Sequence, residues 1–253
     1  MNSTVWRTFI YLLLLLIPMV YLQRFLQREI QAVFLLVTRQ PDISMVLFSL
    51  LFLPGVFLHE SSHFITAQVL GVRTGRFSII PRKLDSGRIR LGYVETAQTD
   101  FVRDALIGVA PFVTGGLFVA FAGVYRLGLN SIWVSIIQGQ LSTINQAIKT
   151  AAAQPDFWLW FYLVFTISST MMPSESDRRA WMPVIVVIAG SFVFILIIGV
   201  GPWLISNLGK TFLTAMNAVT LVFGITVMIH LIFLPPTWLI RKIISRIVGL
   251  QVV

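Results

Sequence analysis

Residues 59–63, with the sequence HESSH, lie inside an apolar stretch from Ile43 to Leu70 and hold two of the three histidines of the chain. On a helix, residues four positions apart share a face, so the imidazoles of His59 and His63 can reach a single zinc ion. Glu60 then points beside them, where its carboxylate can take a proton from a water molecule. The spacing therefore predicts a zinc-dependent hydrolase.

The apolar surroundings of this motif strengthen the prediction. In a soluble protein, so short a pattern also occurs by chance, with its histidines exposed or paired elsewhere. In a membrane span, an unpaired glutamate at the bilayer centre costs roughly 2.5 kcal/mol or more. A metal ion that binds the neighbouring histidines as neutral ligands supplies a positive charge that offsets this cost.

The composition is that of a polytopic membrane protein. Hydrophobic residues make up 57% of the chain and charged residues only 11%, against about 25% in soluble domains. The net charge of +9 comes from basic residues in short loops, without a basic stripe interleaved with aromatic residues, so nucleic acid is not an expected partner. The chain has no cysteine, which excludes thiolate ligands and leaves histidine or carboxylate groups to complete a zinc site.

The fold class that we expect is an all-α polytopic membrane protein with about six transmembrane helices and a small cytoplasmic, membrane-associated β-hairpin. An amphipathic stretch, residues 23–38, follows the first span, and the last span is expected to end at Pro235 and Pro236. The expected spans, each with enough apolar residues to cross a bilayer, are Trp6–Leu22, Ile43–Leu70, Phe101–Leu127, Phe157–Met172, Met182–Leu208 and Thr211–Leu234.

Residues 71–100 differ from the apolar spans on either side. Two short segments rich in β-branched and aromatic residues, 72–80 and 88–94, flank the sequence Asp-Ser-Gly at 85–87, which favours a turn. The pattern predicts a β-hairpin. The chain as a whole is expected to divide into an N-terminal helix with its amphipathic segment (1–42), a membrane core with the zinc site (43–182) and two C-terminal helices with a basic tail (183–253).

The distribution of basic residues predicts the orientation. The hairpin, the loop with Arg178 and Arg179 and the C-terminal tail are rich in arginine and lysine, and such loops face the cytoplasm. With six spans, both termini are then cytoplasmic. Arg24, Arg28 and Arg39 would lie outside, so an interfacial or re-entrant placement of the first loop stays open. Short loops and the absence of cysteine suit a prokaryotic inner membrane.

A third protein ligand is needed for a tightly bound zinc ion that still accepts water. Asp177, just after the fourth span, lies on the side of the membrane toward which the helix of His59 runs. Glu175 is a competing ligand, and a solvated Asp177 paired with a neighbouring arginine is the alternative without metal. His230, deep in the sixth span, is more typical of a hydrogen-bonded interior histidine than of a ligand.

These features resemble the site-2 protease family of intramembrane zinc metalloproteases. The resemblance covers roughly residues 43–179: an HExxH helix in a span, a cytoplasmic hairpin, a second core span and a third that leads to a proline and a late aspartate. It implies one zinc ion per chain bound by His59, His63 and Asp177, with Glu60 activating water. It also implies that the hairpin, at about Val72 to Glu95, holds an unwound span of a membrane-protein substrate in the lipid bilayer.

The chain also departs from the family pattern. The family usually has an asparagine shortly before the proline and a glycine after the third ligand. Ser169 or Thr170 stands near the asparagine position here, and Arg178 follows Asp177. No PDZ-sized insert is present. The alternative function is therefore a catalytically silent homologue that acts as a membrane scaffold or assembly factor.

Overall fold

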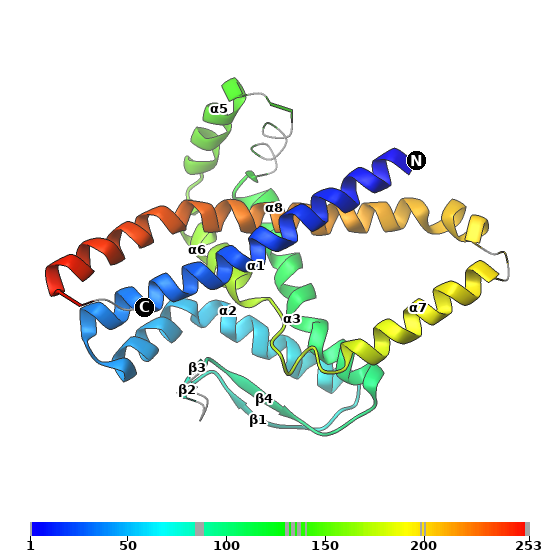
Figure 1. Ribbon diagram of the computed structural model, residues 1–253, viewed down its shortest axis with the longest axis horizontal. Helices are drawn as coiled ribbons and strands as arrows, with labels where there is room; N and C mark the ends of the chain where they lie inside the picture. The colour runs from blue at the N-terminus through cyan, green and yellow to red at the C-terminus, as the bar shows by residue number, and fades with distance from the viewer. Residues whose placement is uncertain are drawn as a thin grey trace.

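The computed structural model describes residues 2–83, 89–129, 132, 135, 138, 139, 141–197, 199 and 201–250. The described chain is mostly helical, with one small region of antiparallel strands (Figure 1). Its helices are α1 (Asn2–Thr38), α2 (Pro41–Val69), α3 (Phe101–Phe121) continued by the π-helix η1 (Ala122–Arg126), α5 (Leu141–Ala152), α6 (Phe157–Thr170), α7 (Trp181–Ile197) and α8 (Gly201–Val248).

Four of the described helical segments are long and apolar enough to cross a membrane, which is compatible with an integral membrane protein. They are Trp6–Thr38, Pro41–Val69, Phe101–Arg126 and Ser206–Val248. Helices α6 and α7 are apolar but shorter. Six spans are thus not confirmed. The regions expected as the fifth and sixth spans are divided differently, because α7 ends at Ile197, Gly199 adopts a φ of 78° and α8 then continues unbroken to Val248.

The expected helix end at Pro235 and Pro236 is wrong, because α8 runs through both prolines. Each proline lacks the N–H that would bond to the carbonyl four residues earlier. Neighbouring helices can hold such a helix together. Here α8 packs along α1, and Arg241, beyond the prolines, donates to Glu29 of α1 at 2.5 Å.

Helices α1 and α8 run in the same direction. Thr8 bonds to Asn217 at 3.0 Å near their starts, and Glu29 pairs with Arg241 near their ends. The chain termini consequently lie at opposite ends of this helix pair (Figure 1). The expected placement of both termini in the cytoplasm stays a prediction.

The predicted β-hairpin is present. Strands β1 (Thr74–Ser78) and β4 (Tyr93–Thr96) pair antiparallel, and β2 (Arg82–Lys83) pairs with β3 (Ile89–Arg90) further out on the same ribbon. A register shift between Thr74 and Phe77 puts a bulge into β1. The turn expected at residues 85–87 lies outside the described residues.

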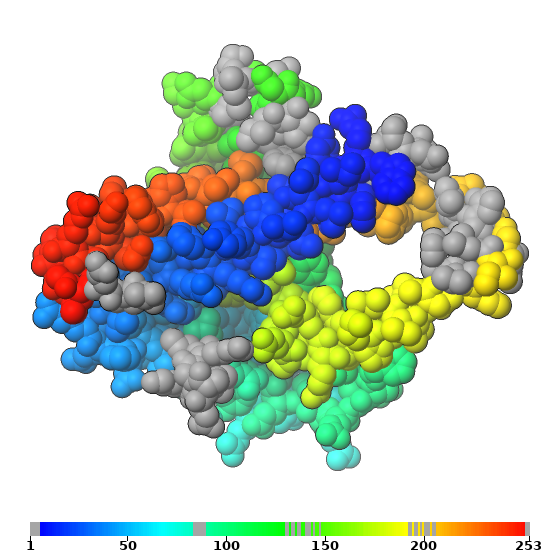
Figure 2. Space-filling view, viewed as in Figure 1, coloured from blue at the N-terminus to red at the C-terminus, as the bar shows by residue number. Residues whose placement is uncertain are grey.

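Helix α7 is the least packed of the apolar helices. Figure 2 shows it extending from the body of the molecule, with an opening between it, α1 and α8. A Cβ atom built on Gly190 or Gly199 meets nothing within 4 Å. These two glycines therefore make no close packing contact within the described chain. Gly55, by contrast, brings α2 so close to Thr166 and Thr170 of α6 that a Cβ atom there would clash.

Candidate metal centre

Helix α2 places His59 and His63 on one face, as the spacing predicts. The two Nε2 atoms lie 3.2 Å apart. His63 is buried and His59 nearly so, with 13% of its side chain exposed. Two ring nitrogens that face each other at this distance need a shared proton or a cation between them, since two lone pairs repel.

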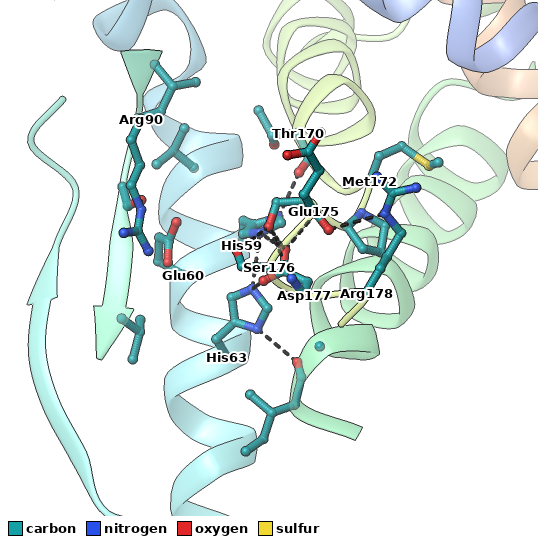
Figure 3. Close-up of a pocket in the computed structure, with 18 of the residues that line it drawn as sticks. His59, Glu60, His63, Arg90, Thr170, Met172, Glu175, Ser176, Asp177 and Arg178 are labelled. Atoms are coloured by element: carbon teal, nitrogen blue, oxygen red, sulfur yellow. Dashed lines mark hydrogen bonds and ion pairs between the residues drawn. The ribbon is translucent and has the colours of Figure 1, made fainter. Parts of the chain in front are cut away.

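Asp177 reaches the histidines from the loop between α6 and α7. Its Oδ1 atom lies 3.4 Å from Nε2 of His63, and its Oδ2 atom lies 3.7 Å from Nε2 of His59. The ligand atoms of these three residues all lie within 4.8 Å of one another, so the group could hold a metal ion (Figure 3). The structure thus brings together the residues that the sequence predicts as ligands.

The spacing of these donor atoms suits a tetrahedral ion. With metal–ligand distances of about 2.0–2.2 Å, tetrahedral geometry separates neighbouring ligand atoms by about 3.3–3.6 Å. The separation of the two Nε2 atoms, 3.2 Å, is close to one such edge, and Asp177 offers Oδ1 at 3.4 Å from His63 and Oδ2 at 3.7 Å from His59. Three protein donors leave the fourth position for a water molecule or a substrate.

Main-chain carbonyls fix the orientation of both imidazoles. Nδ1 of His59 lies 2.7 Å from the carbonyl oxygen of Thr170, and Nδ1 of His63 lies 2.8 Å from that of Ile107. A carbonyl only accepts, so each Nδ1 carries the proton and each Nε2 keeps its lone pair for a ligand. Helices α6 and α3 therefore provide the outer hydrogen bonds of the two histidines.

Asp177 is held in its ionised form by its neighbours. Its Oδ2 accepts from the backbone N–H of Ser174 at 2.7 Å and from the Ser174 hydroxyl at 2.6 Å. Burial raises the pKa of the Asp177 carboxyl, but hydrogen bonds from His59 and His63 in their protonated form, and from Ser174, outweigh it and hold that pKa well below its ordinary value. Metal ligation needs this carboxylate form.

The neighbouring arginines, Arg178 and Arg179, bond to other groups. The alternative in which Asp177 pairs with one of them is therefore not what the structure has. Nε of Arg178 donates to the carbonyl of Ser174 at 3.2 Å, and Arg179 lies 3.6 Å from the carboxylate of Asp104 on α3. Arg178 thus helps to close the loop that presents Asp177.

Gly108 sets the distance between α3 and this loop. A Cβ atom at Gly108 would overlap the carbonyl oxygen of Asp177, whereas one at Gly116 on the same helix would meet only Val222, at 4.0 Å. We expect Gly108→Ala to displace the loop, lower the stability by about 1–3 kcal/mol and weaken metal binding. Thermal unfolding in detergent and metal titration measure the two effects. Gly116→Ala is the matched control, and an equal response of both variants would contradict the prediction.

Glu60 is buried between the histidines and the hairpin. Figure 3 shows Glu60 on the side of α2 that faces the strand carrying Arg90, with Asp177 on the opposite side. Glu60 shares a cavity of about 980 Å³ with the three members of the metal group. The chain from residue 90 to residue 96 also lines this cavity, through Arg90, Leu91 and then every second residue: Gly92, Val94 and Thr96.

Gly92 allows the hairpin to lie against Glu60. A Cβ atom at Gly92 would lie 2.8 Å from Cγ of Glu60 and 3.0 Å from the carbonyl oxygen of Ser78. We expect Gly92→Ala to push the hairpin and Glu60 apart, to leave the metal content unchanged and to lower about 100-fold the turnover of the hydrolysis that the HExxH spacing predicts. Assays of turnover and metal content test this. Gly75→Ala is the control, since its closest neighbour is the end of the flexible Glu95 side chain; normal turnover in Gly92→Ala would refute the prediction.

The two other candidate ligands do not belong to the metal group. His230 is a hydrogen-bonded interior residue, with its Nε2 3.0 Å from Oγ of Ser169 and its Nδ1 2.7 Å from the carbonyl of Thr226. Glu175 lines the same cavity, but among the described residues the group consists of His59, His63 and Asp177.

The sequence did not point to some of the residues that support the site. Ser174, three positions before Asp177, was detectable as a turn residue whose hydroxyl can bond locally. Gln23 and Gln27, on α1, donate to carbonyls at the end of α6. They lie more than 140 positions from these partners, and only their one-turn spacing on a helix hints at a shared role.

Comparisons of the chain with protein-family models, with curated proteins and with solved structures gave no match.

Proposed function

We propose that this protein is an intramembrane zinc metalloprotease that hydrolyses peptide bonds of membrane-spanning substrates. The observation that carries the proposal is the convergence of His59, His63 and Asp177 beside Glu60 in one cavity bordered by a β-strand. Two imidazoles and one carboxylate, without a thiolate, form a ligand set typical of catalytic zinc. When bound, zinc supplies Lewis-acid polarisation of a carbonyl and a lowered pKa of water.

The protein residues have distinct roles in this proposal. Glu60 takes a proton from the attacking water and returns it to the leaving amine, since its carboxylate is the acid–base group next to the ligands. The carbonyl oxygens of Thr170 and Ile107, which accept from the Nδ1 atoms, keep both imidazoles oriented during this proton transfer. Ser174 keeps Asp177 aimed at the histidines.

The position of the hairpin beside the cavity supports the proposal that the hairpin holds the substrate. A helical span hides its carbonyls in its own hydrogen bonds, so it must unwind before cleavage. An unwound segment can add to the edge of β4, where main-chain hydrogen bonds set its register. The alternation of Gly92, Val94 and Thr96 along the cavity fits an extended partner on that edge. Single-span proteins with helix-weakening residues are the expected substrates.

The proposed location is the inner membrane of a prokaryote, with the hairpin on the cytoplasmic side. The arginines of the hairpin region favour that side, since cytoplasmic loops of membrane proteins carry an excess of basic residues.

The proposal is tested with protein purified in detergent without chelators. Inductively coupled plasma mass spectrometry should find close to one zinc ion per chain. After reconstitution into liposomes, the protein should cleave single-span reporters in which glycine and proline weaken the span, and should spare a leucine-rich reporter. Phenanthroline should stop the cleavage and added zinc restore it.

The same experiment addresses the scaffold alternative, which Arg178 after Asp177 motivates. Zinc-free protein, or protein that captures the reporters and leaves them intact, would favour a non-cleaving scaffold. Cleavage that survives removal of zinc would refute the metalloprotease.

A further inference from the structure

Helix α6 is apolar but too short to cross a membrane. It has 14 residues, which span about 21 Å, less than the roughly 30 Å of a bilayer core. Its last helical hydrogen bond runs from the N–H of Met171 to the carbonyl of Ile167 at 2.9 Å. The carbonyls of residues 168–170 are left without helical donors, and in a membrane such groups must find partners inside the protein.

Each of these three carbonyls accepts from a side chain of another helix. Nε2 of Gln23 donates to Ser168 at 2.5 Å, Nε2 of Gln27 donates to Ser169 at 2.8 Å, and Nδ1 of His59 donates to Thr170 at 2.7 Å. Gln23 and Gln27 lie one turn apart on α1, so one face of this helix caps two carbonyls.

The residues after the break are the donors that a continued helix would use. In a continued helix, the N–H of Met172 would donate to the carbonyl of Ser168 and the N–H of Ser174 to that of Thr170. Pro173 has no N–H that could donate to the carbonyl of Ser169. In the structure, the N–H of Ser174 instead donates to Oδ2 of Asp177. One more helical turn would thus remove the hydrogen-bond partners of two metal ligands at once: the Thr170 carbonyl from His59 and the Ser174 N–H from Asp177.

We infer that Gln23 and Gln27 are positioning residues of the metal centre. By capping the carbonyls of Ser168 and Ser169, they hold α6 in its interrupted form, which presents the Thr170 carbonyl to His59 and the Ser174 N–H to the third ligand. Helix α1 is therefore part of the support of the site, although none of its residues belongs to the metal group. This inference rests on the metal centre of the proposed function.

Cobalt(II) provides a test that does not require activity. Purified metal-free protein is titrated with cobalt, and its visible absorption bands report the geometry and number of ligands. Gln23→Leu and Gln27→Leu should each weaken cobalt binding about 10- to 100-fold, and the double variant more, with shifted bands. Gln31→Leu, one turn further along α1, is the matched control and should bind like the wild type.

The outcomes separate the inference from the proposed function. A wild type that binds cobalt and a double variant that binds it equally well, with the same bands, overturn the inference alone. A wild type that binds neither cobalt nor zinc overturns the metal centre, and the inference with it. Gel filtration and circular dichroism verify folding. If a leucine variant does not fold, Gln23→Met or Gln27→Met is used in its place, because methionine removes the same donor and has an unbranched side chain.

Discussion

Glu60→Gln should lower peptide-bond cleavage by about 100- to 10,000-fold, the usual contribution of a positioned general base, while the zinc content stays that of the wild type. Glutamine keeps the shape of the buried side chain next to Gly92 but cannot accept a proton from water. The three ligand atoms are untouched. Cleavage of a reporter in liposomes and metal analysis of the same preparation measure both quantities.

Glu95→Gln is the control for this experiment, because Glu95 is exposed on β4 and its carboxylate accepts from the N–H of Arg76. This variant should cleave nearly as fast as the wild type. Cleavage that persists in Glu60→Gln would remove Glu60 from the mechanism. Loss of zinc in Glu60→Gln would show that Glu60 is a ligand instead of a base.

Asp177→Asn should weaken zinc binding by at least about 100-fold, more than the loss of a typical outer hydrogen bond, and should abolish cleavage as a consequence. Asparagine can still accept from Ser174, so the loop stays close to its place. It lacks the negative charge that draws a cation toward His59 and His63. Competition with a chromophoric chelator gives the affinity.

Glu175→Gln is the matched control, since it removes a carboxylate that lies two residues before Asp177, on the same loop, and lines the same cavity. Its zinc affinity should be close to that of the wild type. The reverse pattern, with affinity lost in Glu175→Gln and kept in Asp177→Asn, would make Glu175 the third ligand.

The metal group was largely predictable because its chemistry restricts the choice of residues. HExxH specifies a helix face by spacing alone, and a chain without cysteine has few candidates for a third ligand. Asp177 followed from its place after an apolar span. The partners of these ligands were not predictable, because Thr170 and Ile107 contribute main-chain oxygens, which carry no signature in the side-chain sequence.

The helical framework was predictable in type but not in its divisions. Hydropathy identifies apolar segments, yet it cannot distinguish a proline that ends a helix from one that neighbouring helices tolerate, and Pro235 lies within α8. The stretch of residues 23–38 likewise looked like a separate amphipathic segment. Glu29 lies inside one continuous helix and pairs with Arg241, a partner 212 positions later that the local pattern of residues 23–38 does not reveal.

The pairing of α1 with α8 has a consequence for the order in which the chain is made. Thr8, Gln23 and Glu29 leave the ribosome first, but Asn217, Ser168 and Arg241, their partners, follow far behind, up to 212 positions later. During this interval the polar side chains of α1 must wait without these partners. A nascent chain of 63 to 176 residues holds both histidines but not Asp177, so the ligand group is complete only after residue 177 has been made.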